Sequence, residues 1–182
     1  AAGPCPRVLE IYQHGLAHSV ATSVPPPPAD GPPPPHARGP ADRDADLTRA
    51  AFRARLAAYA RELELGEAYP FFIFRRSDDV LVGAVRLFHV RRGVAQTGSI
   101  GYWIGQSFTR QGLMSDAVQA VIRFAFTGLG LHRLEAACMP QNAASAALLL
   151  KCGFSEEGYA PAYLKINGAW RDHRLFGLVA SE

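Results

Sequence analysis

Cysteine is scarce in this chain, whose 182 residues include only Cys5, Cys138 and Cys152. An odd number of cysteines without the spacing of a zinc site indicates neither a disulfide framework nor a metal centre. Long apolar runs are also missing, because no stretch approaches the roughly 20 residues that a membrane-spanning helix needs. The N-terminus lacks the basic and then apolar pattern of a signal peptide. These absences predict a soluble protein that stays in the reducing cytoplasm and binds no membrane.

Clustered positive charge is missing as well. The formal net charge is +3, and the 19 Lys and Arg residues are spread along the chain instead of forming blocks. A nucleic-acid-binding surface needs such clusters. We therefore expect no direct contact with nucleic acid, whereas a mild positive bias suits a phosphorylated cofactor.

Proline is rare after residue 40, since 11 of the 14 prolines lie in residues 1–40. Proline removes amide donors and blocks helices, so residues 22–46 are predicted to be extended or disordered. Two interpretations remain open: a mistranslated or frame-shifted start, or a true Pro-rich linker that binds partners. We divide the chain into an atypical Pro-rich N-terminal segment, residues 1–45, and one globular domain, residues 46–182.

The second part has the pattern of a mixed α/β (α+β) domain around one central sheet. Apolar residues at helical spacing predict two long helices, and Asn-Gly or Ser-Asp-Asp gaps between apolar stretches predict two hairpins. The expected elements are a helix over 52–63 closed by Gly66, strands 69–75, 80–88 and 97–104, a helix over 114–125, a strand 133–139, a helix from Asn142 to Gly153, and strands 155–166 and 172–180.

The most informative segment is Gly101-Tyr102-Trp103-Ile104-Gly105, followed by the loop 109–114 and a helical pattern. A strand that leads through a loop of free backbone amides to a helix N-terminus is an arrangement that holds pyrophosphate. Gly112 lets the main chain approach an anion without a Cβ in the way. The plainer interpretation is an aromatic strand and a glycine that begins a helix. Because residues 142–154 add a second strand end and helix, the pair points to acyl transfer from coenzyme A.

These motifs, with HRLEA, MPQNAAS, GF, EGYA and NGAWRDH further along, resemble the GCN5-related N-acetyltransferases (GNAT), and within them the ribosomal-protein alanine N-acetyltransferases. The resemblance covers residues 52–179. It implies the GNAT fold, a mostly antiparallel twisted sheet that is splayed at its middle and flanked by helices. It also implies a metal-free enzyme, monomer or homodimer, that transfers the acetyl group of acetyl-CoA directly to a primary amine, preferably the N-terminal α-amine of a ribosomal protein.

The resemblance also assigns the cofactor contacts. Backbone amides of the 102–104 strand are implied to bind the pantetheine arm and the thioester carbonyl, where donors stabilise the developing oxyanion. The phosphate loop keeps the glycine at 112 but departs from the family pattern at its first and last positions. The implied cofactor-binding residues are Tyr102, Trp103, Ile104, Thr109, Arg110, Gln111, Gly112, Leu113, Met114 and Asn142.

Ser145 is the candidate catalytic residue on the helix after Asn142. It matches the family residue proposed as the acid that reprotonates the departing thiolate. Leu149 stands where many members carry a tyrosine, so Ser145 is the one hydroxyl in position on this helix. The alternative is a serine that only caps the helix or faces solvent.

No general base follows from the sequence, because Ser99 stands where many relatives carry Glu and Leu164 stands where one related subgroup has its proposed base. An α-amine, with a pKa of about 7.7 to 8.0, needs less help than a lysine near 10.4, which favours an N-terminal acceptor. The resemblance places Trp170, Asp172 and His173 near the acceptor. Structural pairing at a hairpin is the other interpretation of this cluster.

Two rival functions remain open at this point. One is an N-acetyltransferase for small amines or aminoglycoside-type drugs. The other is a catalytically silent CoA-binding protein, because neither a base nor the N-terminal strand and helices that wall the family's acceptor site are evident.

Overall fold

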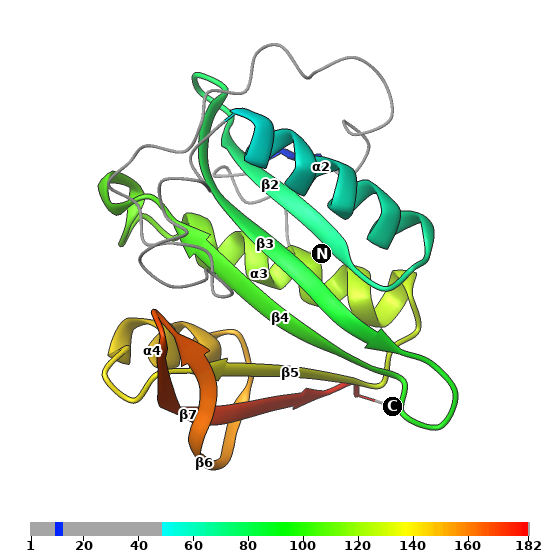
Figure 1. Cartoon of the computed structure of the whole chain (residues 1–182), viewed down its shortest axis with the longest axis vertical. Helices are drawn as coiled ribbons and strands as arrows, with labels where there is room; N and C mark the ends of the chain where they lie inside the picture. Colours follow the sequence, from blue (N-terminus) through cyan, green and yellow to red (C-terminus); the bar gives the residue numbers. More distant parts are fainter. Residues whose placement is uncertain (1–9, 13–48, 182) are drawn as a thin grey trace, which may run out of the picture.

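The fold comes from a computed structural model, in which residues 10–12 and 49–181 are described (Figure 1). Helices and strands alternate in one mixed α and β order, as the sequence predicted. The elements are β1 (Glu10–Tyr12), α2 (Arg49–Glu64), β2 (Tyr69–Arg75), β3 (Val80–Arg91), β4 (Thr97–Ile104), a 3-10 turn (Gln106–Phe108), α3 (Leu113–Arg123) with a π-helical end (Phe124–Gly128), β5 (Arg133–Cys138), α4 (Ala143–Lys151), β6 (Ser155–Ile166) and β7 (Ala169–Val179).

All strands join one seven-stranded sheet in the order β1-β2-β3-β4-β5-β7-β6. Every neighbouring pair is antiparallel except β4 and β5, which run parallel. Parallel neighbours need a crossover connection, and α3 supplies it here. The predicted mostly antiparallel sheet flanked by helices is therefore confirmed.

The helices cover the sheet on both faces. Arg86 of β3 pairs with Glu62 of α2 on one face, whereas Met114 of α3 lies close to Gly83 of the same strand on the other. The thiol of Cys152, just past α4, contacts the Ser115 carbonyl of α3, so α3 and α4 share a face. The apolar stripe of α3 is buried there, as its spacing predicted: Leu113, Met114, Ala117, Val118, Val121 and Ile122. No helix in the described part of the chain is long and apolar enough to cross a membrane.

Two strand ends differ from the prediction by more than one residue. β7 begins at Ala169 instead of residue 172, because Asn167 and Gly168 both have positive φ and form a two-residue turn that lets Ile166 pair with Ala169 at once. β3 continues to Arg91, since a bulge at His89, with φ 50°, bends the strand without ending it.

The N-terminal segment contributes a strand that was not predicted. β1 pairs antiparallel with β2, with Ile11 opposite Ile73. The expectation that this segment lacks a strand was wrong, because three residues are too few to show the alternation that identifies one. The predicted extended stretch 22–46 lies outside the described residues, and the division at residue 45 stays a prediction.

Candidate functional site

The sheet opens between β4 and β5. Their parallel ladder holds only three residue pairs, from Thr97 opposite Arg133 to Ser99 opposite Glu135. Beyond Ser99 the two strands diverge toward their carboxyl ends, as Figure 1 shows. Residues 100–104 of β4 remain paired with β3 on their other side. The edge of β4 that faces β5 is thus free of sheet pairing along Tyr102, Trp103 and Ile104, and the predicted splay is confirmed.

A loop and a helix N-terminus follow the open end of β4. Gly112 is the N-cap of α3 with φ 82° and ψ −11°, a left-handed conformation that costs other residues energy. As a glycine, this N-cap has no side chain that could bond the first amides of α3. The positive end of the helix dipole is therefore open to an anion.

The side chains of the loop 109–114 divide into two groups. The Thr109 hydroxyl donates to the Gln106 carbonyl, and the Gln111 amide donates to the Ser107 carbonyl, so both hold the loop in shape. Arg110 is exposed and has a positive φ of 59°. Leu113 and Met114 point into the core, 7% and 5% exposed, so only their main chain can meet a ligand.

The N-terminus of α4 lies on the other side of the opening. The Asn142 side chain accepts a hydrogen bond from the Ser145 backbone amide at 3.1 Å, which makes it the predicted N-cap. This cap uses the backbone of Ser145 and leaves the hydroxyl for another partner.

That partner is the Tyr102 hydroxyl of β4. It lies 2.8 Å from Ser145 Oγ and 3.3 Å from the Ser145 carbonyl, to which it donates. Because Tyr102 reaches α4 from the far side of the opening, Ser145 faces the gap between β4 and β5. This contact argues against a serine that simply faces solvent.

Burial sets the protonation of the groups around Ser145. It raises the pKa of the Tyr102 phenol well above its usual range, and the hydrogen bond with Ser145 offsets only part of the rise. Burial likewise raises the pKa of the Cys138 thiol at the end of β5. Both groups are therefore protonated at neutral pH, and the region beside Ser145 holds hydroxyl and thiol donors instead of anions.

The three predicted acceptor residues lie on β7 but in different surroundings. Trp170 is 63% exposed, whereas His173 is buried, with Nδ1 against the Arg171 carbonyl. Asp172 accepts hydrogen bonds from the Tyr159 hydroxyl and the Ala162 amide. These two donors, the hydroxyl first, lower the pKa of Asp172. Both donors belong to β6, so these hydrogen bonds tie Asp172 to the neighbouring strand of the hairpin.

The structure places a carboxylate beside the opening that the sequence did not indicate. Glu135 is the register partner of Ser99 in the last pair of the β4–β5 ladder. Only the pairing of two strands far apart in the sequence brings them together, and alternation within each strand carries no information about that register. Among the residues that the structure describes, no cluster of three or more His, Cys, Asp or Glu is placed to hold a metal ion.

Comparison with known proteins identifies the architecture. Residues 34–155 match the acetyltransferase (GNAT) domain family. The chain is 44% identical over 127 residues to YjcK of Bacillus subtilis, named a probable N-acetyltransferase, with 70% of each chain covered. It is 37% identical over 131 residues to the ribosomal protein uS5-alanine N-acetyltransferase of Escherichia coli, covering 72% of this chain and 68% of that one.

A solved structure agrees with these relatives. RimJ of Mycobacterium smegmatis, in complex with CoA-disulfide, matches with a TM-score of 0.74 and 31% identity, over 84% of this chain and 70% of the other. The open β4–β5 pair, the uncapped start of α3 and these similarities lead to one conclusion: the chain belongs to the GNAT family of acetyltransferases, in which it is similar to the ribosomal-protein acetyltransferases.

Proposed function

We propose that this acetyltransferase moves the acetyl group of acetyl-CoA to the N-terminal α-amine of a protein, with ribosomal proteins as the favoured acceptors. The observation that carries the proposal is the opening of the sheet after Ser99, directly before the uncapped N-terminus of α3. An extended pantetheine arm fits the unpaired edge of β4, because it carries amides that can replace the missing strand. We also propose that residues 46–182 form the catalytic domain and that it works in the cytoplasm, as a monomer or a homodimer.

The diphosphate of the cofactor would bind where α3 begins. Backbone amides at the start of an 11-residue helix, together with its dipole, favour an anion. Gly112 supplies a main-chain surface without a Cβ, and the exposed Arg110 side chain adds a positive charge beside it. A helix end whose amides were capped by a side chain, with no charged residue beside it, would offer neither free donors nor a positive charge to the diphosphate.

The acetyl transfer itself needs two kinds of donor. Main-chain amides of Trp103 and its neighbours on the unpaired edge of β4 would hold the thioester carbonyl and stabilise the oxyanion when the amine attacks. As the C–S bond breaks, the Ser145 hydroxyl would give its proton to the thiolate. Tyr102, hydrogen bonded to Ser145 Oγ at 2.8 Å, is positioned to return a proton to the serine.

The acceptor preference is supported by the relatives and by the acid–base groups of the site. The Escherichia coli relative is named for an alanine of ribosomal protein uS5. An α-amine is partly neutral at pH 7, unlike a lysine side chain. The exposed Trp170 on the β6–β7 hairpin would contact the peptide beyond its first residue.

The test follows thiol release from acetyl-CoA with a panel of acceptors. We expect rapid release with peptides that copy ribosomal-protein N-termini. The matched control is the same peptide with a formylated N-terminus and an internal lysine, for which release should fall at least about tenfold, because lysine is mostly protonated at neutral pH. Equal rates with spermidine or aminoglycosides would indicate a small-amine enzyme. CoA binding with no release above hydrolysis for any acceptor would indicate a catalytically silent protein.

Gly83 of β3 offers a separate prediction about the β4 edge. A Cβ at this position would collide with the Trp103 carbonyl and approach Ile104 Cα at 3.1 Å. Gly83→Ala should therefore push β4 away from β3, lower the free energy of unfolding by about 1–3 kcal/mol and weaken acetyl-CoA binding. Thermal unfolding with and without CoA measures both effects. Gly158→Ala is the control, since a Cβ there meets nothing within 4 Å, and equal behaviour of the two variants would contradict the prediction.

A further inference from the structure

Glu135 stands at the closed end of the opening between β4 and β5. It forms the last pair of the ladder with Ser99, so the strands separate immediately after it. Along β5, Leu134, Ala136 and Cys138 are buried in the core, and Glu135 therefore points to the opposite face of the sheet. On that face its side chain is 40% exposed. A substrate amine that enters from this face would meet this carboxylate where the strands begin to part.

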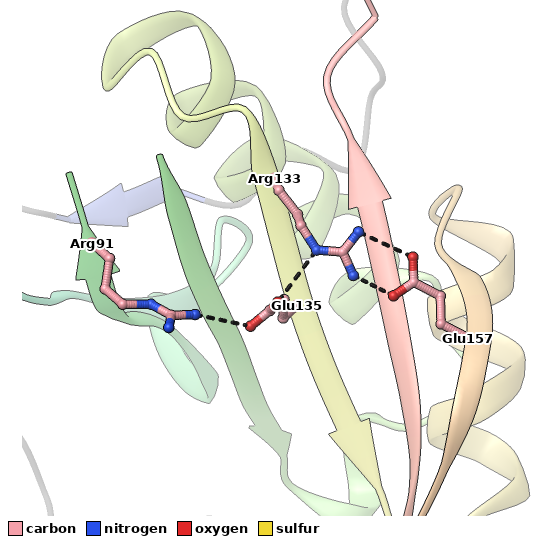
Figure 2. Close-up of polar contacts among 4 residues, drawn as sticks. All are labelled: Arg91, Arg133, Glu135 and Glu157. Atoms are coloured by element: carbon pink, nitrogen blue, oxygen red, sulfur yellow. Dashed lines mark hydrogen bonds and ion pairs between the residues drawn. The ribbon is translucent and has the colours of Figure 1, made fainter. Parts of the chain in front are cut away.

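A row of charged side chains orients Glu135, as Figure 2 shows. Arg133 of the same strand reaches Glu135 through Nε at 3.3 Å, and Arg91 of β3 reaches it at 3.5 Å. On its other side Arg133 grips Glu157 of β6 with both terminal nitrogens. β7 lies between these strands with Gly177, where a Cβ would collide with Glu157 and Arg133.

The contacts of Glu135 are looser than those of Glu157. Charge-assisted hydrogen bonds between nitrogen and oxygen are typically about 2.7–2.9 Å long, and both arginine contacts of Glu135 exceed this range. Both terminal guanidinium nitrogens of Arg133 already donate to the carboxylate of Glu157. Glu135 is thus held in place while its oxygens keep capacity for another donor, because an ionised carboxylate accepts at about four lone-pair positions.

Few other groups near Glu135 can exchange a proton. Its charged neighbours among the residues that the structure describes are Arg91 from β3, Arg133 from β5 and, behind Arg133, Glu157 from β6. β4 presents Ser99 at the paired position, and β7 presents Gly177. The arginines are protonated at every working pH and the serine is not a base. Among the described residues at this end of the opening, Glu135 is the carboxylate with more room for a further donor, because Arg133 binds both oxygens of Glu157.

We infer that Glu135 is the general base of the reaction and takes the proton directly from the acceptor ammonium. This inference rests on the proposed function. The ammonium gives one proton to the carboxylate, and the freed nitrogen lone pair forms the C–N bond with the thioester carbon. As the C–S bond breaks, Ser145 gives its proton to the thiolate, and the second proton that the nitrogen loses passes through water or the Tyr102 hydroxyl to Ser145, which is thereby restored. Glu135 returns its proton to solvent, so that one amide, one thiol and one free proton result.

The experiment compares wild-type protein, Glu135→Gln and Glu157→Gln with a peptide acceptor that has a free α-amine. The readout is kcat/KM between pH 6.5 and 9.5, with thermal unfolding and CoA binding measured on the same samples. An α-amine is only about one-twentieth neutral at pH 6.5 but almost fully neutral at pH 9.5. Glu135→Gln should therefore be at least about tenfold slower than wild type at pH 6.5 and within about twofold at pH 9.5, with CoA binding unchanged.

Glu157→Gln is the matched control, because it removes a carboxylate of similar exposure from the same row of charges. It should stay within about twofold of wild type at every pH. If the row of charges had only a structural role, Glu157→Gln should lose more activity than Glu135→Gln, since Arg133 binds Glu157 more closely than Glu135. A loss in Glu135→Gln that is constant with pH, no loss at pH 6.5, or an equal loss in Glu157→Gln overturns the inference. Wild-type protein that acetylates no amine at any pH overturns the proposed function instead, and the role of Glu135 with it.

Discussion

Replacing Ser145 with alanine is expected to lower kcat about 10²-fold or more while KM for acetyl-CoA changes little. A positioned acid typically contributes 10²- to 10⁴-fold to a rate. The proton is needed only in the transition state, when the thiolate leaves, so its loss lowers kcat and not the binding of acetyl-CoA. The Ser145 hydroxyl faces the opening and is held by Tyr102 at 2.8 Å. Steady-state rates of thiol release at saturating peptide provide the measurement.

The same substitution separates catalysis from helix capping. The Asn142 cap accepts from the backbone amide of residue 145, which alanine keeps. Ser145→Ala should therefore unfold within about 0.5 kcal/mol of wild type, a typical range for a change that leaves packing intact. Tyr102→Phe, which removes the partner of Ser145 and keeps the ring, should lower kcat about tenfold. Ser155→Ala at the exposed start of β6 is the control with no expected change. Full activity of Ser145→Ala would contradict the prediction and would mean that water protonates the departing thiolate.

The sequence predicted the local parts of the site better than their assembly. Stretches bounded by turn residues placed β2, β4 and β6 where they lie, and the spacing of apolar residues identified the buried stripe of α3. Gly112 was singled out because it lacks a Cβ, and the structure places it at the start of α3 with a positive φ, which favours glycine. These features depend on residues that are close in the chain, so the pattern of the sequence carries them.

The assembly depends on contacts between distant residues. The splay of β4 came from the family resemblance and the strand order β5-β7-β6 was not predicted, since periodicity within one strand does not choose its neighbours. Glu135 was missed for this reason, because its place beside Ser99 is a matter of register. The Tyr102 side chain was missed because only the backbone of its strand was considered. The contact of Asp172 with the acceptor stays a prediction, and the structure adds two donors within the hairpin that the sequence did not indicate.

Replacing Phe176 with alanine is expected to have the largest effect on stability, a loss of about 3–5 kcal/mol in the free energy of unfolding. Phe176 on β7 is 2% exposed and belongs to the same buried cluster as Ala146 and Leu149 of α4. Its removal deletes buried apolar surface and leaves a cavity that the rigid sheet cannot fill. Urea denaturation measures the change, with Val179→Ala, at a 48% exposed position of the same strand, as a control expected to cost no more than about 0.5 kcal/mol. This cluster supports the helix that carries Ser145. Phe176→Ala should therefore also lower kcat at urea concentrations below its unfolding midpoint, where the variant is still folded. A loss of less than about 1 kcal/mol would mean that the C-terminal hairpin does not hold α4 against the sheet.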